Sequence, residues 1–171
     1  MATADVKVYT GTAISWAPSG GTHALSLSSL TTTATCGWQG AKGDLGTPRG
    51  ARMAVRLKSG FETSPTAGAT IEVYWAASPA STAANENPAG TVGTDGVFAT
   101  AATAKSNLQF IGCLVAEATT DIQTADVGVF IPDLQYGMPV CVNKSAVSLA
   151  TATASHALTI YPVIDQIQAS A

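Results

Sequence analysis

The most reactive side chains in the sequence are three cysteines and two histidines, and each of them stands alone. Cys36, Cys113 and Cys141 match neither a zinc-ligand spacing nor a CxxC redox pair, and each lies in an apolar segment. We therefore predict that they are small buried side chains in a reducing compartment. His23 and His156 have no neighbouring ligands, whereas a metal site usually needs two or three at short spacing. We predict structural histidines with local hydrogen bonds and no metal.

The carboxylates are scattered along the chain, and no two of them form an obvious acid–base pair. Asp121 and Asp126 lie in a turn-rich stretch, and Asp95 belongs to an Asp-Gly turn. The sequence contains no GxSxG elbow, no DxDxDG calcium loop and no glycine motif in a phosphate-binding context. A glycosidase with carboxylates from distant strands stays open as an alternative. We expect a protein that is not an enzyme, with no catalytic residues and no cofactor.

Charged residues make up only 11% of the chain, against roughly 25% in an average globular protein. Such a surface carries little charge repulsion, which suits a subunit packed against copies of itself or against a larger particle. The basic residues cluster only at Arg49, Arg52, Arg56 and Lys58, and we interpret them as a solvated strand face with its entry loop. We expect no nucleic-acid partner.

Neither a membrane span nor a secretory signal is visible in the sequence. No apolar stretch approaches 18 residues, and the first residues lack a charged segment followed by an apolar run. We therefore expect no membrane contact and a protein that stays in the cytosol until it assembles.

Three tryptophans are candidates for stacking or for an interface. Trp75 is in phase with Ile71 and Val73, so we assign it to the core. Trp16 and Trp38 border loops, where an exposed ring could stack on a sugar or anchor an interface.

The strongest structural signal is the strict alternation over residues 52–58. Met53, Val55 and Leu57 fall on one face, and basic residues occupy the other. A period of two predicts a β-strand with one wet face. Residues 70–75 alternate in the same way, and antiparallel pairing of these two segments would place Glu72 near Arg56 or Lys58.

Further strand-like segments recur along the chain, and no segment of comparable strength has helical period. Residues 108–115 are continuously apolar and predict a central buried strand, whereas Pro139 places residues 137–143 at a sheet edge or strand start. The pattern predicts an all-β, antiparallel β-sandwich, jelly-roll-like. The remaining predicted strands span residues 6–9, 13–16, 23–28, 31–38, 121–131 and 156–164.

We expect a single sandwich domain over residues 1–171, with residues 1–5 as an N-terminal arm and residues 165–171 as a polar tail. One long irregular loop interrupts it at about residues 78–107, a stretch rich in Ala, Thr, Gly, Asn and Pro. Only Val92, Val97 and Phe98 could anchor this loop within the chain. We therefore expect contacts from outside the chain to hold it.

Three segments of the C-terminal third resemble small structural proteins of tailed-bacteriophage virions. They are the FIG-x-L strand in residues 108–116, the YG-x-PV strand in residues 127–145 and the LT-x-YP-x-ID segment in residues 156–168. The resemblance implies a β-sandwich protein on the capsid surface, made in the host cytoplasm. It implies no catalytic residues.

The role implied by the resemblance is capsid decoration, or cement, that stabilises the phage head by binding between major capsid subunits. The implied partners are the major capsid protein and copies of the chain itself, with a trimer favoured over a dimer. The alternative is a carbohydrate-binding sandwich in host adsorption, or a tail or fibre component. The candidate assembly contacts are Met1, Ala2, Thr3, Asp5, Trp16, Trp38, Arg49, Val97 and Phe98.

Overall fold

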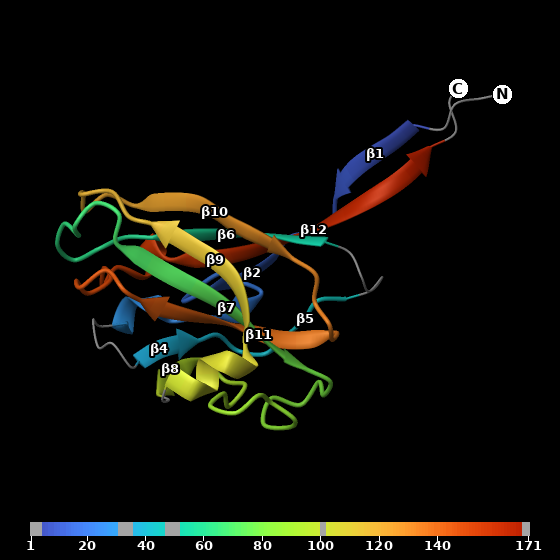
Figure 1. Ribbon diagram of the computed structural model, residues 1–171, viewed down its shortest axis with the longest axis horizontal. Helices are drawn as coiled ribbons and strands as arrows, with labels where there is room; N and C mark the ends of the chain where they lie inside the picture. Colours follow the sequence, from blue (N-terminus) through green and yellow to red (C-terminus); the bar gives the residue numbers. More distant parts are fainter. Residues whose placement is uncertain (1–4, 31–35, 47–51, 100–101, 169–171) are drawn as a thin grey trace.

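The computed structural model describes residues 5–30, 36–46, 52–99 and 102–168. In these ranges the chain forms two six-stranded sheets, with short 3-10 turns at Leu27–Ser29, Ala102–Asn107 and Thr153–Ser155 as the helical segments. The sheets pack face to face (Figure 1). They confirm the predicted antiparallel β-sandwich, and the jelly-roll strand order stays a prediction. No helix in the described ranges is long and apolar enough to cross a membrane.

The first sheet, which we call sheet A, has the strand order β10-β6-β12-β2-β3, and β1 pairs with the outer half of β12. All its pairs are antiparallel except β2 with β3. Its strands are β1 (Asp5–Thr10), β2 (Ile14–Ala17), β3 (His23–Ala24), β6 (Arg52–Ser59), β10 (Gln123–Phe130) and β12 (Ala157–Gln168).

The second sheet, sheet B, has the order β8-β4-β11-β7-β9, and the short β5 also pairs with β11. All its pairs are antiparallel. Its strands are β4 (Cys36–Gln39), β5 (Gly43–Asp44), β7 (Thr70–Ser78), β8 (Gly96–Ala99), β9 (Gln109–Val115) and β11 (Tyr136–Asn143).

The alternation in β6 produces the two faces that the sequence predicts. Met53, Val55 and Leu57 are buried in the main core between the sheets. On the wet face Arg56 pairs with Asp126 of β10, at 2.7 Å between Nε and Oδ1, and Arg52 pairs with Asp165 of β12. Both pairs are exposed, so each contributes about 0–1 kcal/mol. Two of the four clustered basic residues are therefore paired with carboxylates within sheet A.

The large side chains on the inner faces hold the sheets together. Trp75, Ile71 and Val73 of β7 are fully buried, as predicted, and Trp75 lies edge-on to Trp16 of β2 at 5.8 Å between ring centroids. Full burial of each large apolar side chain contributes roughly 1.5–3 kcal/mol relative to exposure. A second, smaller cluster lies on the outer face of sheet B, where Phe98 and Leu108 cover Met138, Val140 and Val142.

Two glycines close one side of the sandwich. The edge strands β9 and β10 belong to different sheets, yet a Cβ on Gly112 would overlap the carbonyl oxygen of Val127. A Cβ on Gly128 would likewise overlap the carbonyl oxygen of Ile111. The backbones can approach this closely only because both positions lack a side chain.

This closure explains why one strand prediction was wrong. The apolar run in residues 108–115 predicted a central buried strand, but β9 is an edge strand in which Phe110 and Val115 are exposed. Leu114 is buried in the main core and Ile111 packs against it, whereas Phe110 and Val115 face solvent.

The opposite error occurred in β11, which Pro139 had placed at an edge. The strand instead lies between β4 and β7. The carbonyl oxygen of Pro139 accepts a bond from the Gly40 amide, so the missing N–H faces the short connection between β4 and β5. Pro139 therefore lies between the residues of β11 that pair with β4 and those that pair with β5. Its missing N–H removes no hydrogen bond between paired strands.

Four further expectations need correction. Glu72 does not lie near Arg56 or Lys58, because β6 and β7 belong to different sheets. The predicted strand over residues 23–28 is the two-residue β3 followed by a 3-10 turn, although Leu25 and Leu27 are buried as expected.

The expected loop over residues 78–107 is shorter than predicted. The strand β7 continues to Ser78, and β8 with the turn Ala102–Asn107 occupies the second half of the segment. The irregular loop therefore covers residues 79–95. The expected tail is also different, since residues 165–168 belong to β12.

We expect Gly112→Ala to lower the free energy of unfolding by about 2 kcal/mol or more, because the added methyl must separate β9 from β10. The matched control is Gly96→Ala in β8, where a Cβ meets no atom within 4 Å and the change should stay within about 0.5 kcal/mol. Urea titrations of both variants measure this difference. Equal stabilities would show that the seam does not depend on the missing side chain.

Candidate functional site

His156 makes the local hydrogen bonds that the sequence predicts for a structural histidine, whereas His23 makes a ring contact. His156 is buried between β6 and the turn before β12, with Nδ1 at 3.2 Å from Ser59 Oγ and Nε2 at 2.7 Å from the Ala150 carbonyl oxygen. The carbonyl can only accept, so Nε2 carries the proton and the Ser59 hydroxyl donates to Nδ1. Burial lowers the pKa of His156. This Ser–His pair is closed off from solvent and has a carbonyl where a catalytic triad has an acid.

His23 lies on the Trp16 ring, at 5.0 Å between ring centroids. Burial lowers its pKa, and the nearby Asp44 opposes that shift. Among the cysteines, Cys141 is fully buried, which raises its thiol pKa to about 12, and Cys113 is half-buried and free. No cluster of three or more His, Cys, Asp or Glu side chains that could hold a metal ion occurs in the described ranges.

Lys42 organises the loop over residues 79–95. Its ammonium lies 2.8 Å from Ser78 Oγ and donates to the carbonyl oxygens of Ala80, Thr82 and Asn85 at 3.1, 2.8 and 2.8 Å. Burial lowers the pKa of Lys42 despite the nearby Glu86. One positive charge therefore replaces the apolar anchors that this loop lacks.

Asp95 fixes the far end of the same loop. Its carboxylate accepts from the Ser26 backbone amide at 2.8 Å, from the Ser26 hydroxyl, and from the Trp38 indole at 2.7 Å. Gln39 adds bonds to Thr94 and Val92. Polar bonds within the chain therefore hold this loop where apolar anchors are few, and the expected outside contacts stay a prediction.

The most distinctive surface feature is a two-stranded ribbon formed by β1 and the outer half of β12. Figure 1 shows it projecting from the sandwich. The register runs from Thr10↔Val163 to Asp5↔Gln168. Val8 and Tyr9 are 66% and 55% exposed, and the alternation places them on opposite faces. Val163 also pairs with Arg52 of β6, and beyond it, in the described ranges, β12 pairs with β1 alone.

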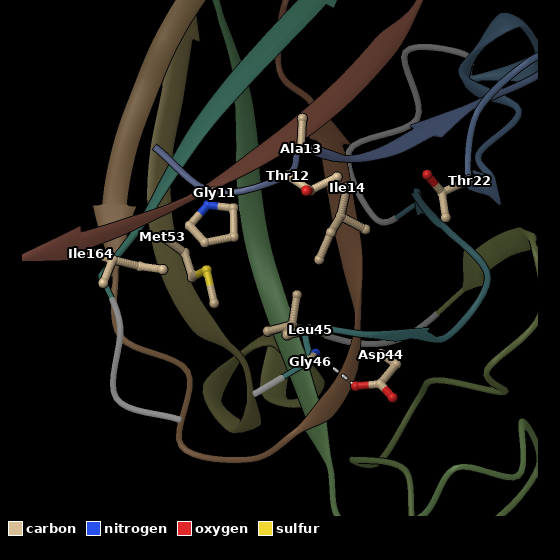
Figure 2. A pocket seen from close by; sticks show the side chains of 11 residues that line it. Gly11, Thr12, Ala13, Ile14, Thr22, Asp44, Leu45, Gly46, Met53 and Ile164 are labelled. Carbon is tan, nitrogen blue, oxygen red and sulfur yellow. Dashed lines mark hydrogen bonds between the residues drawn. The ribbon is translucent and has the colours of Figure 1, made fainter. Parts of the chain in front are cut away.

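A cavity of about 420 Å³, which we call the root pocket, lies where the ribbon leaves the sandwich. Ile14, Leu45, Met53 and Ile164 line it from four different strands or loops, and Figure 2 shows their side chains pointing toward one another. Its other lining residues are Gly11, Thr12, Ala13, Thr22, Asp44, Gly46 and Pro162.

Asp44 supplies the charged group of the root pocket. Its carboxylate accepts from the Gly46 amide at 2.7 Å and from the Gln135 side chain at 3.1 and 3.2 Å. The exposed Asp44 carboxylate can accept further bonds, since ionised oxygens offer about four lone-pair sites. The pocket thus combines an apolar wall with one acceptor at its rim.

A second apolar surface follows the seam between β9 and β10. Phe110, Val129 and Ile131 are all more than half exposed. The approach of Gly112 to Val127 and of Ile111 to Gly128 sets an antiparallel order that brings Phe110 beside Val129. We call these three residues the seam strip.

The predicted assembly contacts are only partly surface residues. Trp16 and Phe98 are buried in the two apolar clusters, so their prediction as contacts was wrong: each ring fills a gap between strands. Val97 is exposed, and Trp38 is half-buried with its indole bound to Asp95. Asp5 begins β1. Met1, Ala2, Thr3 and Arg49 lie outside the described residues.

Sequence reasoning missed the root pocket, the Lys42 contacts and the seam strip. The residues that line the pocket come from positions 11 to 164, and no local sequence pattern predicts that they lie close together. The alternation in the opening strand places Tyr9 on one face of that strand. The alternation does not indicate which of the two faces is exposed to solvent. Comparisons with protein families, with curated proteins and with solved structures found no match to this chain.

We expect the protein to lose stability as pH falls below about 6.5, the pKa of an unfolded histidine. The lowered folded-state pKa of His156 means that the unfolded chain binds the proton more readily, so the stabilisation is complete above that pH and declines below it. His23 acts in the same direction. Urea titrations at pH 7.5 and 5.5 should show a smaller decline in His156→Gln than in the wild type. An unchanged decline would exclude His156 as its source.

We expect Lys42→Met to release the loop over residues 79–95, because three carbonyl oxygens lose their charged donor. The loss of unfolding free energy should be about 1–3 kcal/mol. Cleavage by endoproteinase Glu-C after the exposed Glu86 reports on the loop itself. Lys58→Met removes the same charge from β6 and should leave this cleavage slow. Slow cleavage in both variants would contradict the role of Lys42.

Proposed function

We propose that this chain is a structural subunit of a tailed-bacteriophage virion, most specifically a decoration protein that binds between major capsid subunits on the head surface. Two features of the sequence support the proposal: the resemblance of residues 108–116, 127–145 and 156–168 to virion structural proteins, and the low charge of 11%. The observation that carries it is the projecting ribbon of β1 and β12.

A two-stranded ribbon is marginally stable on its own in water, because it buries little apolar surface for the entropy that it loses. Here both faces present apolar side chains to solvent, through Val8 on one and Tyr9 on the other. Exposed strand edges are also a template for pairing with another chain. The ribbon therefore suits a molecule that spends its working life covered by neighbouring subunits.

The seam strip offers a second surface that suits a flat apolar contact with the shell. Phe110 packs beside Tyr74 at 5.2 Å between ring centroids, so its ring is held in place before any partner arrives. Apolar patches of this kind on soluble proteins mark interaction sites. A decoration protein that binds only the closed shell stabilises it by mass action.

The carbohydrate-binding alternative has less support from the positions of the tryptophans. Trp16 is fully buried and donates its indole N–H to the Ala41 carbonyl oxygen, so it presents no face for sugar stacking. Trp38 is half-buried, and its indole is committed to Asp95. An enzymatic role has no specific observation in its favour.

We expect the protein to sediment with empty capsids assembled from the major capsid protein of the same genome, with saturable stoichiometry. The double variant Phe110→Ser/Val129→Ser should bind more than tenfold more weakly, because it removes the apolar surface of the seam strip. Val92→Ser changes an equally exposed valine on the loop and should bind normally. Circular dichroism confirms that each variant is folded.

Removal of residues 1–5 tests the expected N-terminal arm in the same assay and should also weaken binding. A folded wild-type protein that stays in the supernatant at every capsid concentration would exclude decoration. Quenching of tryptophan fluorescence by sugars, with hits on a glycan array, would then favour the carbohydrate-binding alternative.

A further inference from the structure

The inner apolar face of sheet A extends beyond the sheet that covers it. Leu158 and Ile160 of β12 are fully buried, and Pro162 and Ile164 continue the same face into the ribbon. Pro162 and Ile164 line the root pocket together with Met53 and Leu45. The pocket is thus the place where the core of the sandwich ends without a complete cover.

Tyr9 lies directly beside this opening. It pairs with Ile164 across the ribbon, so both side chains lie on the same face. Ile164 lines the root pocket, whereas Tyr9 does not and is more than half exposed. Each molecule therefore presents the exposed Tyr9 ring and the root pocket on one continuous surface.

We propose that Tyr9 of one copy inserts into the root pocket of a second copy of this chain. The inference rests on the proposed function only in that both describe an assembling subunit, and it names the partner of the ribbon. Because every copy carries both the ring and the hole, the contact is satisfied throughout only in a closed assembly, as a reciprocal dimer or as a ring. A trimer formed head to tail is such a ring.

The chemistry of the pocket matches a tyrosine better than it matches an aliphatic side chain. Its wall of Ile14, Leu45, Met53 and Ile164 would cover the ring, and the Asp44 carboxylate at the rim can accept from the phenol. A buried tyrosine hydroxyl usually needs such an acceptor. Its volume of about 420 Å³ lies within the range of pockets that hold aromatic ligands.

The area of the contact indicates how strong it can be. A whole tyrosine buries roughly 150–250 Å², but Tyr9 is 55% exposed and can bury only about half of that area, with a similar area lost from the pocket wall. Two such contacts bury on the order of 500 Å² in a dimer, below the size of a standard specific interface. We therefore expect a weak association in solution, one that a shell would reinforce by holding copies close together.

The test uses one variant without the ring and one without the hole. Tyr9→Ala removes the ring, and Ala13→Trp fills the pocket from an exposed position between β1 and β2. Sedimentation velocity at concentrations up to about 1 mM measures the mass, since a Kd of about 1 mM corresponds to only about 4 kcal/mol of binding free energy. We expect the wild type to be a dimer or trimer and each variant alone to be a monomer. An equimolar mixture of the two restores only one contact, between Tyr9 of one variant and the pocket of the other, so it should associate more weakly than the wild type and only as a heterodimer.

Two controls make the result specific to the tyrosine contact. Val8→Ala changes the opposite face of the ribbon and should keep the wild-type mass. Tyr9→Phe keeps the ring and loses the bond to Asp44, so it should associate roughly tenfold more weakly. Thermal midpoints confirm that each variant is folded, and Thr12→Trp is a second pocket-filling variant should Ala13→Trp fail to fold.

A monomeric wild type would overturn the proposal, as would a folded Tyr9→Ala or Ala13→Trp variant that keeps the wild-type mass. These failures are distinct from a failure of decoration. A monomer that sediments with capsids would leave the proposed function standing and remove the second copy as partner of the ribbon. An oligomer that ignores capsids would do the reverse.

Discussion

The strand β12 is longer than the part of it that sheet B covers, and the rest of the structure depends on this difference in length. This strand has twelve residues and lies at the centre of sheet A, between β6 and β2, with β1 on its outer half. Leu158 and Ile160 in its first half are fully buried between the sheets, and its outer half continues past sheet B into the ribbon. One strand therefore creates the core, the pocket at its end and the projection beyond it.

Local alternation allowed much of the fold to be predicted from the sequence. Arg52–Ser59 and Thr70–Ser78 are strands with the predicted residues inward, because one buried face leaves a period of two. The failures have a common cause in relations between distant segments. The gap that admits Pro139 depends on where β4 and β5 end, and the exposure of Phe110 depends on glycines that bring β9 to β10. Neither relation leaves a local pattern. The root pocket, gathered from five segments, could be predicted least of all.

Hydrogen bonds, rather than apolar packing, hold the long loop of this protein in place. Residues 79–95 contribute almost no side chains to either apolar cluster. Their backbone carbonyls instead surround the Lys42 ammonium at one end, and their Asp95 binds Ser26 and Trp38 at the other. A loop held in this way can keep a surface of small residues, since no bulky anchor is required. The few charges of the chain are concentrated at such structural positions, which is consistent with a surface that otherwise carries little charge.

The pairing of β1 with the outer half of β12 joins residue 5 to residue 168, nearly the full span of the chain. During synthesis β1 leaves the ribosome first, and its partner emerges last. The centre of sheet A is also missing until β12 arrives, so β6 and β2 have no common neighbour before then. Pairing of such distant segments is slow, because the chain loses the entropy of closing a long loop before it gains any stabilising contact. A chain that stops before β12 thus lacks both a finished core and a ribbon.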